Sequence, residues 1–141
     1  MAALVLVATL AARSPQRLRD IVVPWRMVLI LAAVFAAVQV LLAVGLEGVL
    51  REVAGAGTAP SDLLRVAGVG ALAANGVNNL PAYLALEPVA AGDPLRLMAL
   101  LVGVGVAPIV TLWASLATLL WHQRLRAVGV EVPWGRYVLV G

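Results

Sequence analysis

Three long apolar runs, separated by short connections rich in charged residues, glycine and proline, dominate the sequence. They cover residues 27–46, 63–86 and 95–121, and each has the roughly 20 residues that a helix needs to cross a 30 Å hydrocarbon core. Shorter apolar segments lie at residues 2–12 and after Arg136. Only helices and closed barrels satisfy their backbone groups in lipid. The pattern therefore predicts an all-α integral membrane protein, with residues 1–141 in a single transmembrane domain.

Both ends of the chain have the pattern of interrupted helices. The run 2–12 is about half the length of a span, and Arg13 and Arg17 follow it rather than precede it, the reverse of a signal peptide. We expect it to be the end of a helix that begins outside this sequence. Residues 131–136 resemble the start of a helix at headgroup depth, and the chain stops five residues later. The sequence thus predicts a fragment whose final helix is truncated.

Composition supports the membrane class and excludes several chemistries. Hydrophobic residues make up 63% of the chain and charged residues 12%, against about 45–50% apolar in soluble domains. There is no cysteine and one histidine, His122, so we expect no disulfide, thiolate or zinc site. The ten basic residues lie in short loops, which does not favour nucleic acid as a partner. No nucleophile–base pair or phosphate loop is present, so we expect neither an enzyme nor a cofactor.

A cluster of carboxamides interrupts the second long run. Asn75, Asn78 and Asn79 stand at i, i+3 and i+4, so a helix would put them on one face. Gly76 and Pro81 interrupt such a helix. Amides beside broken backbone can bind a cation, an anion or a neutral hydroxide. The alternative is that they only join neighbouring helices; the sequence favours a binding site that includes Pro81.

The third run predicts a broken helix. Residues 95–121 exceed one span, and two glycines and a proline fall within residues 103–108. We expect the backbone to unwind there, with Gly105 and Pro108 at the break. Gly103 and Gly105 have an alternative role in close helix packing.

Hydroxyl residues follow the predicted break. Thr111, Ser115 and Thr118 fall at i, i+4 and i+7, which predicts one polar stripe on the helix after it. We place Thr111 and Ser115 among the candidate substrate- and ion-binding residues. Hydroxyls of this kind also bond back to their own helix, and that alternative remains open.

The distribution of arginine predicts the topology. Residues 13–26 and 122–136 are basic, whereas the connections between them are net negative. If residues 63–86 enter the membrane and return as a re-entrant hairpin, both basic loops face the cytoplasm, as the positive-inside rule prefers. The asparagine cluster would then form the hairpin tip near the midplane. We expect a return helix of about eight residues, which covers about 12 Å.

The connections are predicted from their turn residues. Residues 47–62 read as a polar connection with a turn at 55–60, after which Ser61 or Asp62 would cap the next helix. Glu87-Pro88 and Gly92-Asp93-Pro94 are expected to belong to the loop that follows residue 86.

Two motifs resemble a known family. Residues 74–83 (ANGVNNLPAY) followed by residues 108–121 (PIVTLWASLATLLW) are similar to the C-terminal half of arsenite-pump type permeases. These belong to an ion transporter superfamily that also contains sodium-coupled dicarboxylate and citrate carriers and sodium/proton antiporters. The resemblance covers nearly all of the chain.

The resemblance implies the second of two inverted repeats, with a re-entrant hairpin and a broken helix, and with the first repeat absent. It assigns Asn78, Asn79 and Pro81 to the tip and Pro108 and Thr111 to the break. Relatives have an asparagine, a glycine and a second proline where this chain has Gly105, Ala107 and Leu112. The loss of the asparagine removes a ligand, and the loss of the proline is expected to let the helix re-form.

We therefore expect part of a multi-pass transporter of the inner (cytoplasmic) membrane. It would move arsenite or an oxyanion and couple this movement to protons, by antiport, or to the membrane potential. Its partners would be the lipid bilayer and either the missing N-terminal half or a second copy. The alternatives are a fragment of a sodium-coupled dicarboxylate or citrate carrier or of a sodium/proton antiporter, a non-transporting helical subunit, and a degenerate remnant.

Overall fold

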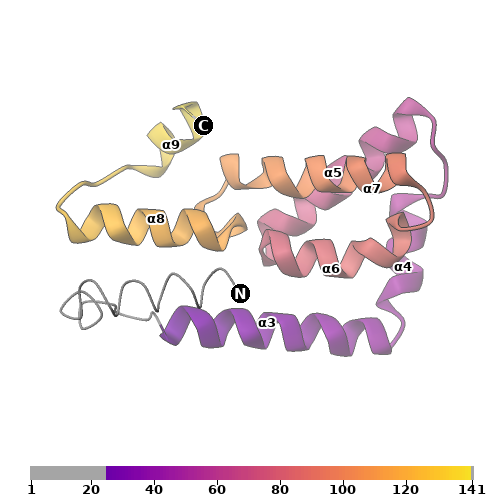
Figure 1. Cartoon of the computed structure of the whole chain (residues 1–141), viewed down its shortest axis with the longest axis horizontal. Coiled ribbons are helices and arrows are strands. Elements are labelled where there is room, and N and C mark those ends of the chain that lie inside the picture. Colours follow the sequence, from indigo (N-terminus) through magenta and orange to yellow (C-terminus); the bar gives the residue numbers. More distant parts are fainter. Residues whose placement is uncertain (1–24, 141) are drawn as a thin grey trace, which may run out of the picture. The chain divides into compact units, whose positions relative to one another are not determined.

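The computed structural model describes residues 25–140, and within them every regular element is helical (Figure 1). Seven α-helices and two 3-10 turns follow in order: α3 Trp25–Ala43, α4 Leu46–Ala54, α5 Pro60–Val77, α6 Asn79–Ala90, α7 Pro94–Val106, η1 Ala107–Ile109, η2 Leu112–Ala114, α8 Leu116–Ala127 and α9 Trp134–Val140. The predicted all-α class is confirmed for these residues. The predictions for residues 2–12 and for Arg13 and Arg17 lie outside them.

Helix α3 matches the first predicted span. It has 19 residues with a mean hydropathy of 2.3, and it is the one helix of residues 25–140 that is long and apolar enough to cross a membrane. The chain divides into two compact units, Met1–Ala33 and Val34–Gly141. The packing described below belongs to the second unit.

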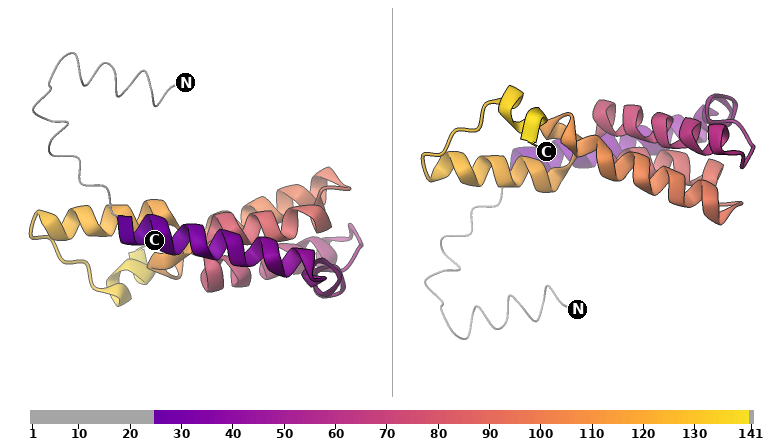
Figure 2. Two further views of the ribbon diagram at one scale, coloured as in Figure 1. Left: turned by 90° about the horizontal axis from the view of Figure 1, so that it is seen from below. Right: turned by 90° about the horizontal axis from the view of Figure 1, so that it is seen from above.

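Helices α5, α6 and α7 form the core of this unit. The chain runs along α5, turns back along α6 and turns again into α7, so that the three helices lie side by side (Figures 1 and 2). Buried alanines and a few larger residues, among them Val66, Leu86 and Leu100, fill the space between them. Small residues at helix contacts let backbones approach closely, as in membrane bundles.

The closest approach is between α5 and α7. A Cβ atom on Gly103 would lie 2.1 Å from the carbonyl oxygen of Ala67, so only glycine fits there. Gly70 packs in the same way against Leu100, with 3.0 Å from its ideal Cβ position to Leu100 Cδ1. The packing role considered for Gly103 is therefore the one that the structure has.

The predicted polar connection 47–62 contains a helix, and that part of the prediction is wrong. Helix α4 forms because Leu50 and Ala54, four residues apart, both pack into the core. On its polar side Glu47 and Arg51, also four residues apart, form an ion pair of 2.6 Å. The segment is helical despite its many charged residues, because its apolar residues and its ion pair both recur at helical spacing.

The expected cap at Ser61 or Asp62 is confirmed in part. Helix α5 begins at Pro60 with Ala59 as its N-cap residue, but Asp62 supplies a capping side chain, since its Oδ2 accepts a hydrogen bond from the Ala59 N–H at 3.2 Å. Proline suits the first helical position, where its missing N–H costs nothing.

The return helix α6 is longer than the predicted eight residues. It has 12 residues and continues through Glu87 and Pro88 to Ala90, so these two residues do not belong to a loop. Val89 and Ala90 are buried against the core, which favours continuing the helix past the proline. The turn to α7 is short, and Asp93 caps α7 by accepting from the N–H groups of Leu95 and Arg96.

Arginine side chains hold the end of the hairpin that lies away from its turn. We call this end the root: the loop 55–59, the turn 91–93, and Arg65 and Arg96. Arg96 is 4% exposed, and it donates to the carbonyls of Gly55 at 2.6 Å and Gly57 at 2.7 Å. Arg65 donates to the carbonyl of Val53 at 2.6 Å. Both connections therefore lie at the same end of the hairpin.

Candidate functional site

Asn78 forms the turn between α5 and α6. Its φ of 87° and ψ of 149° make it the one non-glycine residue with positive φ in the described part of the chain. Its N–H donates to the carbonyl of Ala74 at 2.9 Å, and its Oδ1 accepts from the N–H of Leu80 at 3.5 Å. The prediction that the three asparagines share one helix face is wrong, because the helix ends before Asn78.

The tip of the hairpin, residues 75–81, is bonded to the segment that follows α7. The Asn78 amide donates to the carbonyl of Trp113 at 2.8 Å, and the Thr111 hydroxyl donates to Asn75 Oδ1 at 2.6 Å. The indole N–H of Trp113 donates to the carbonyl of Asn75 at 2.5 Å. Three hydrogen bonds thus join residues 35 to 38 positions apart in the sequence.

That segment is the break in the long apolar run. Helix α7 continues through Gly103 and Gly105 to Val106, and from Ala107 to Ser115 the chain forms the two short 3-10 turns η1 and η2, with extended backbone at Thr111 and Ser115. The predicted break at residues 103–108 is therefore placed too early, since the glycines keep their helical hydrogen bonds and Gly103 is needed for packing. The helix does not re-form at Leu112 either, contrary to the expectation from its missing proline.

The predicted stripe of hydroxyl residues on one helix is also wrong. Thr111 and Ser115 both have extended backbone, with φ and ψ of −132° and 141° and of −140° and 135°. Both are buried, at 7% and 9% exposure, while Thr118 lies in α8. Because a stripe requires one continuous helix, the break moves Thr111 to the asparagines instead.

The other predicted site residues lie around this junction in different ways. Asn79 is half-buried at the start of α6, and its amide makes no hydrogen bond to another residue of the described range 25–140. Pro81 is fully buried. Ser115 is the N-cap residue of α8. Gly105 is exposed, with open space at its Cβ position, so the structure does not bring it to the tip.

The junction is electrically neutral. No charged residue occurs in residues 66–86 or 97–121, which supply both the tip and the break. Its polar groups are amides, hydroxyls, backbone carbonyls and an indole N–H. One N–H of Asn75 Nδ2 is already used, because it donates to the carbonyl of Ala71 at 2.9 Å. The hydroxyl oxygen of Thr111, the second N–H of Asn78 and the amide of Asn79 keep hydrogen-bonding capacity.

Sequence reasoning missed three aromatic residues at the junction. Trp113 contacts both Asn75 and Asn78, Trp134 donates to the carbonyl of Val110 at 3.0 Å, and the Tyr137 hydroxyl donates to the carbonyl of Pro108. The position of Trp113 could have indicated its role. Tryptophan in membrane helices is concentrated at the interfaces, whereas Trp113 lies well inside an apolar run.

Comparison with known protein families gives one match. The family described as Arsenical pump membrane protein matches residues 1–141, the whole chain. Searches of curated proteins and of solved structures gave no match.

Proposed function

We propose, since the chain belongs to the arsenical pump membrane protein family, that its tip and break form part of a binding site for neutral arsenite. The family consists of membrane transporters and not of enzymes. The absence of enzymatic activity, the membrane setting and the link to arsenical resistance that the sequence predicted are thereby confirmed. The substrate of this chain and the residues that bind it are proposals.

One observation carries the proposal, namely the direct bonding of the tip to the break. Thr111 donates to Asn75 at 2.6 Å and Asn78 donates to the carbonyl of Trp113 at 2.8 Å. Polar groups on a half-helix end, opposite unwound backbone, are the arrangement by which transporters bind substrates inside the bilayer. The amides and the hydroxyl therefore lie where a small polar substrate would be bound.

The chemistry of the junction favours a neutral hydroxide over an anion. Arsenite is an uncharged trihydroxide near neutral pH, and it offers three O–H donors and several lone pairs. The hydroxyl oxygen of Thr111 and the amides of Asn78 and Asn79 can exchange hydrogen bonds with such a molecule. Arginine and lysine are the side chains that bind a carboxylate or an oxyanion most strongly, and residues 66–86 and 97–121 contain neither.

The same reasoning extends to membrane topology. We propose that α5 and α6 are a re-entrant hairpin in the second inverted repeat of a multi-pass protein of the cytoplasmic membrane. Its support is the root, where Arg96 ties the start of α7 to the α4–α5 loop and to the end of α6. A charged root belongs at the headgroups and a neutral tip near the midplane.

A second function has its own supporting observation. All the hydrogen bonds of Asn75 and Asn78 described above are made within the protein, as they would be if the amides only joined helices in a non-transporting subunit. Asn79 separates the two functions, because its half-buried amide makes no such bond within residues 25–140.

The test compares Asn79→Ala with Asn78→Ala in the chain reconstituted in lipid nanodiscs, with arsenite binding measured by calorimetry. A site predicts that Asn79→Ala weakens arsenite binding by about tenfold, the effect of one lost hydrogen bond in a buried site, with unchanged thermal stability. Arsenate and citrate should not compete. Arsenite binding that survives Asn79→Ala unchanged, combined with lower stability in Asn78→Ala, would support the helix-joining role instead.

A further inference from the structure

Two prolines in this chain have different effects on their helices. Pro88 lies inside α6, yet the helix continues to Ala90. Pro108 lies where the helix is lost from Ala107 to Ser115. Proline removes one backbone hydrogen bond of a helix, but membrane helices often tolerate it. Proline alone therefore does not explain an interruption that extends from Ala107 to Ser115.

The break differs from α6 in what its carbonyls accept. The carbonyls of Pro108 and Val110 accept hydrogen bonds from Tyr137 Oη and Trp134 Nε1, both on α9. The carbonyl of Trp113 accepts from the Asn78 amide. In a continuous helix the same carbonyls would accept from the N–H groups four residues later. Side chains from α9 and the tip thus replace the helical partners.

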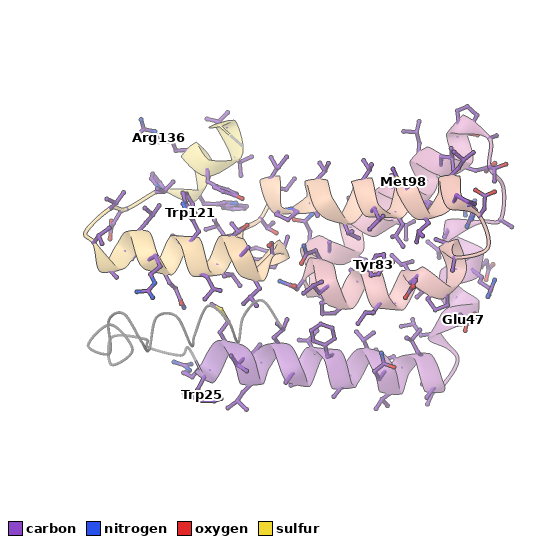
Figure 3. All side chains as sticks on the ribbon, in the orientation of Figure 1. Trp25, Glu47, Tyr83, Met98, Trp121 and Arg136 are labelled. Atoms are coloured by element: carbon purple, nitrogen blue, oxygen red, sulfur yellow. The ribbon has the colours of Figure 1, made fainter. Side chains whose placement is uncertain are left out.

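Ring contacts hold α9 in this position. The rings of Trp113 and Trp134 have centroids 6.4 Å apart, and those of Trp121 and Tyr137 are 6.2 Å apart. Figure 3 shows Trp121 on the side of α8 that faces α9. Such tilted ring pairs are favourable beyond the effect of the buried area alone. The two hydrogen bonds from α9 are therefore supported by a packed aromatic cluster.

We propose that Trp134 and Tyr137 are positioning residues, which keep the break unwound and so keep Thr111 opposite Asn75. Hydrogen bonds from these side chains, rather than the presence of Pro108, maintain the irregular backbone. Without them the carbonyls of Pro108 and Val110 would have no partner in an apolar setting, which is unfavourable. Re-forming the helix would satisfy both and withdraw Thr111 from the tip. The consequence for substrate binding rests on the function proposed above.

Hydrogen–deuterium exchange of the full chain in lipid nanodiscs tests this directly, with four single variants. Trp134→Phe and Tyr137→Phe keep a ring but remove the donor. Pro108→Ala removes the proline. Trp121→Phe is the matched control, because Trp121 contacts the Tyr137 ring but donates no hydrogen bond to the break within the described residues.

In the two donor variants, exchange of the amides in residues 109–115 should slow by about tenfold as the helix re-forms. In Pro108→Ala and Trp121→Phe it should stay within about twofold of the parent. Exchange in α7 is the internal reference, since a general loss of stability would speed exchange there as well. Because Tyr137→Phe removes a single oxygen, it remains informative if Trp134→Phe does not fold.

Equal slowing in Pro108→Ala and Tyr137→Phe would overturn the proposal, as would unchanged exchange in both donor variants. Arsenite binding is measured on the same samples as a separate readout. Slowed exchange in a chain that never binds arsenite would support the positioning role and contradict the proposed function. Unchanged exchange in the two donor variants, together with lost arsenite binding, would contradict the positioning role and support the proposed function.

Discussion

The two ends of the α5–α6 hairpin are held by opposite kinds of chemistry. At the root, guanidinium groups donate to backbone carbonyls, as Arg96 does to Gly55 and Gly57. At the tip, the side-chain hydrogen bonds come from neutral groups, namely amides, a hydroxyl and an indole N–H, as from Asn78 to Trp113. Both ends close a chain reversal, but only the root contains charge. The proposed topology accounts for this difference, because a charge costs little free energy at the headgroups and much more in the hydrocarbon core.

The two ends also differ in how much hydrogen-bonding capacity they keep for a ligand. The root arginines bind the carbonyls at the ends of α4 and α6, where helix dipoles favour positive charge. Their hydrogen bonds are directed at the protein itself. The tip keeps hydrogen-bonding capacity on Thr111, Asn78 and Asn79 that a small ligand can use.

Removal of the buried arginine at the root should cause the largest loss of stability. Arg96→Met should destabilise the chain by about 3 kcal/mol, because it leaves the carbonyls of Gly55 and Gly57 without their buried donor. Reversible unfolding in mixed micelles measures the change. Arg51→Met is the matched control, since the Arg51 side chain is 59% exposed, and it should cost less than about 1 kcal/mol. Equal losses in the two variants would mean that burial of Arg96 does not matter.

The next effect concerns the turn at the tip. Asn78→Ala should cost about 2 kcal/mol in the same unfolding experiment, since it removes the bond to Trp113 and puts alanine at a positive φ. Asn78→Gly removes the same bond but relieves the backbone, so its cost should be about half. If glycine proved worse than alanine, strain at residue 78 would not contribute.

A smaller effect is expected for the contact between tip and break. Thr111→Val keeps the shape of the side chain and removes the hydroxyl that donates to Asn75, so it should cost about 1 kcal/mol of unfolding free energy. Thr111→Ser keeps the hydroxyl and should cost less. A valine variant as stable as the parent would show that this hydrogen bond does not hold the junction together.

The smallest effect on stability is expected for the exposed ion pair of α4. Glu47, labelled in Figure 3, pairs with Arg51 on the exposed side of α4. Glu47→Gln should change the unfolding free energy by less than about 0.5 kcal/mol, and high salt should abolish the difference. A loss comparable to that of Arg96→Met would contradict the view that arginine–carbonyl contacts, rather than the exposed ion pair, hold the root.

Much of the fold follows from the sequence. The length of the apolar runs predicts the first span, and the asparagine cluster with its flanking glycine and proline predicts a reversal of the chain near residue 78. Amide and hydroxyl chemistry at Asn75, Asn78 and Thr111 was also predicted. These features depend on local composition and on residues that are near neighbours in sequence.

The remaining features depend on partners that are distant in sequence. Gly103 reads as a helix breaker by propensity, but its contact with Ala67 makes it a packing residue inside α7. The break begins later because its carbonyls find donors on Trp134 and Tyr137, 24 and 29 residues away. Helix α4 forms because Leu50 and Ala54 pack into a core whose other members lie further along the sequence. Tertiary contacts decided all three.

Cysteine labelling of intact membranes tests whether α5 and α6 enter the bilayer and return to the same side, as we propose. The chain has no cysteine of its own, so single cysteines at Thr58, Gly92 and Val128 report the α4–α5 loop, the α6–α7 turn and the end of α8. We expect an impermeant thiol reagent to reach Thr58→Cys and Gly92→Cys from one side of the membrane and Val128→Cys from the other. Labelling of Thr58→Cys and Gly92→Cys from opposite sides would mean that the hairpin is a full crossing and not re-entrant.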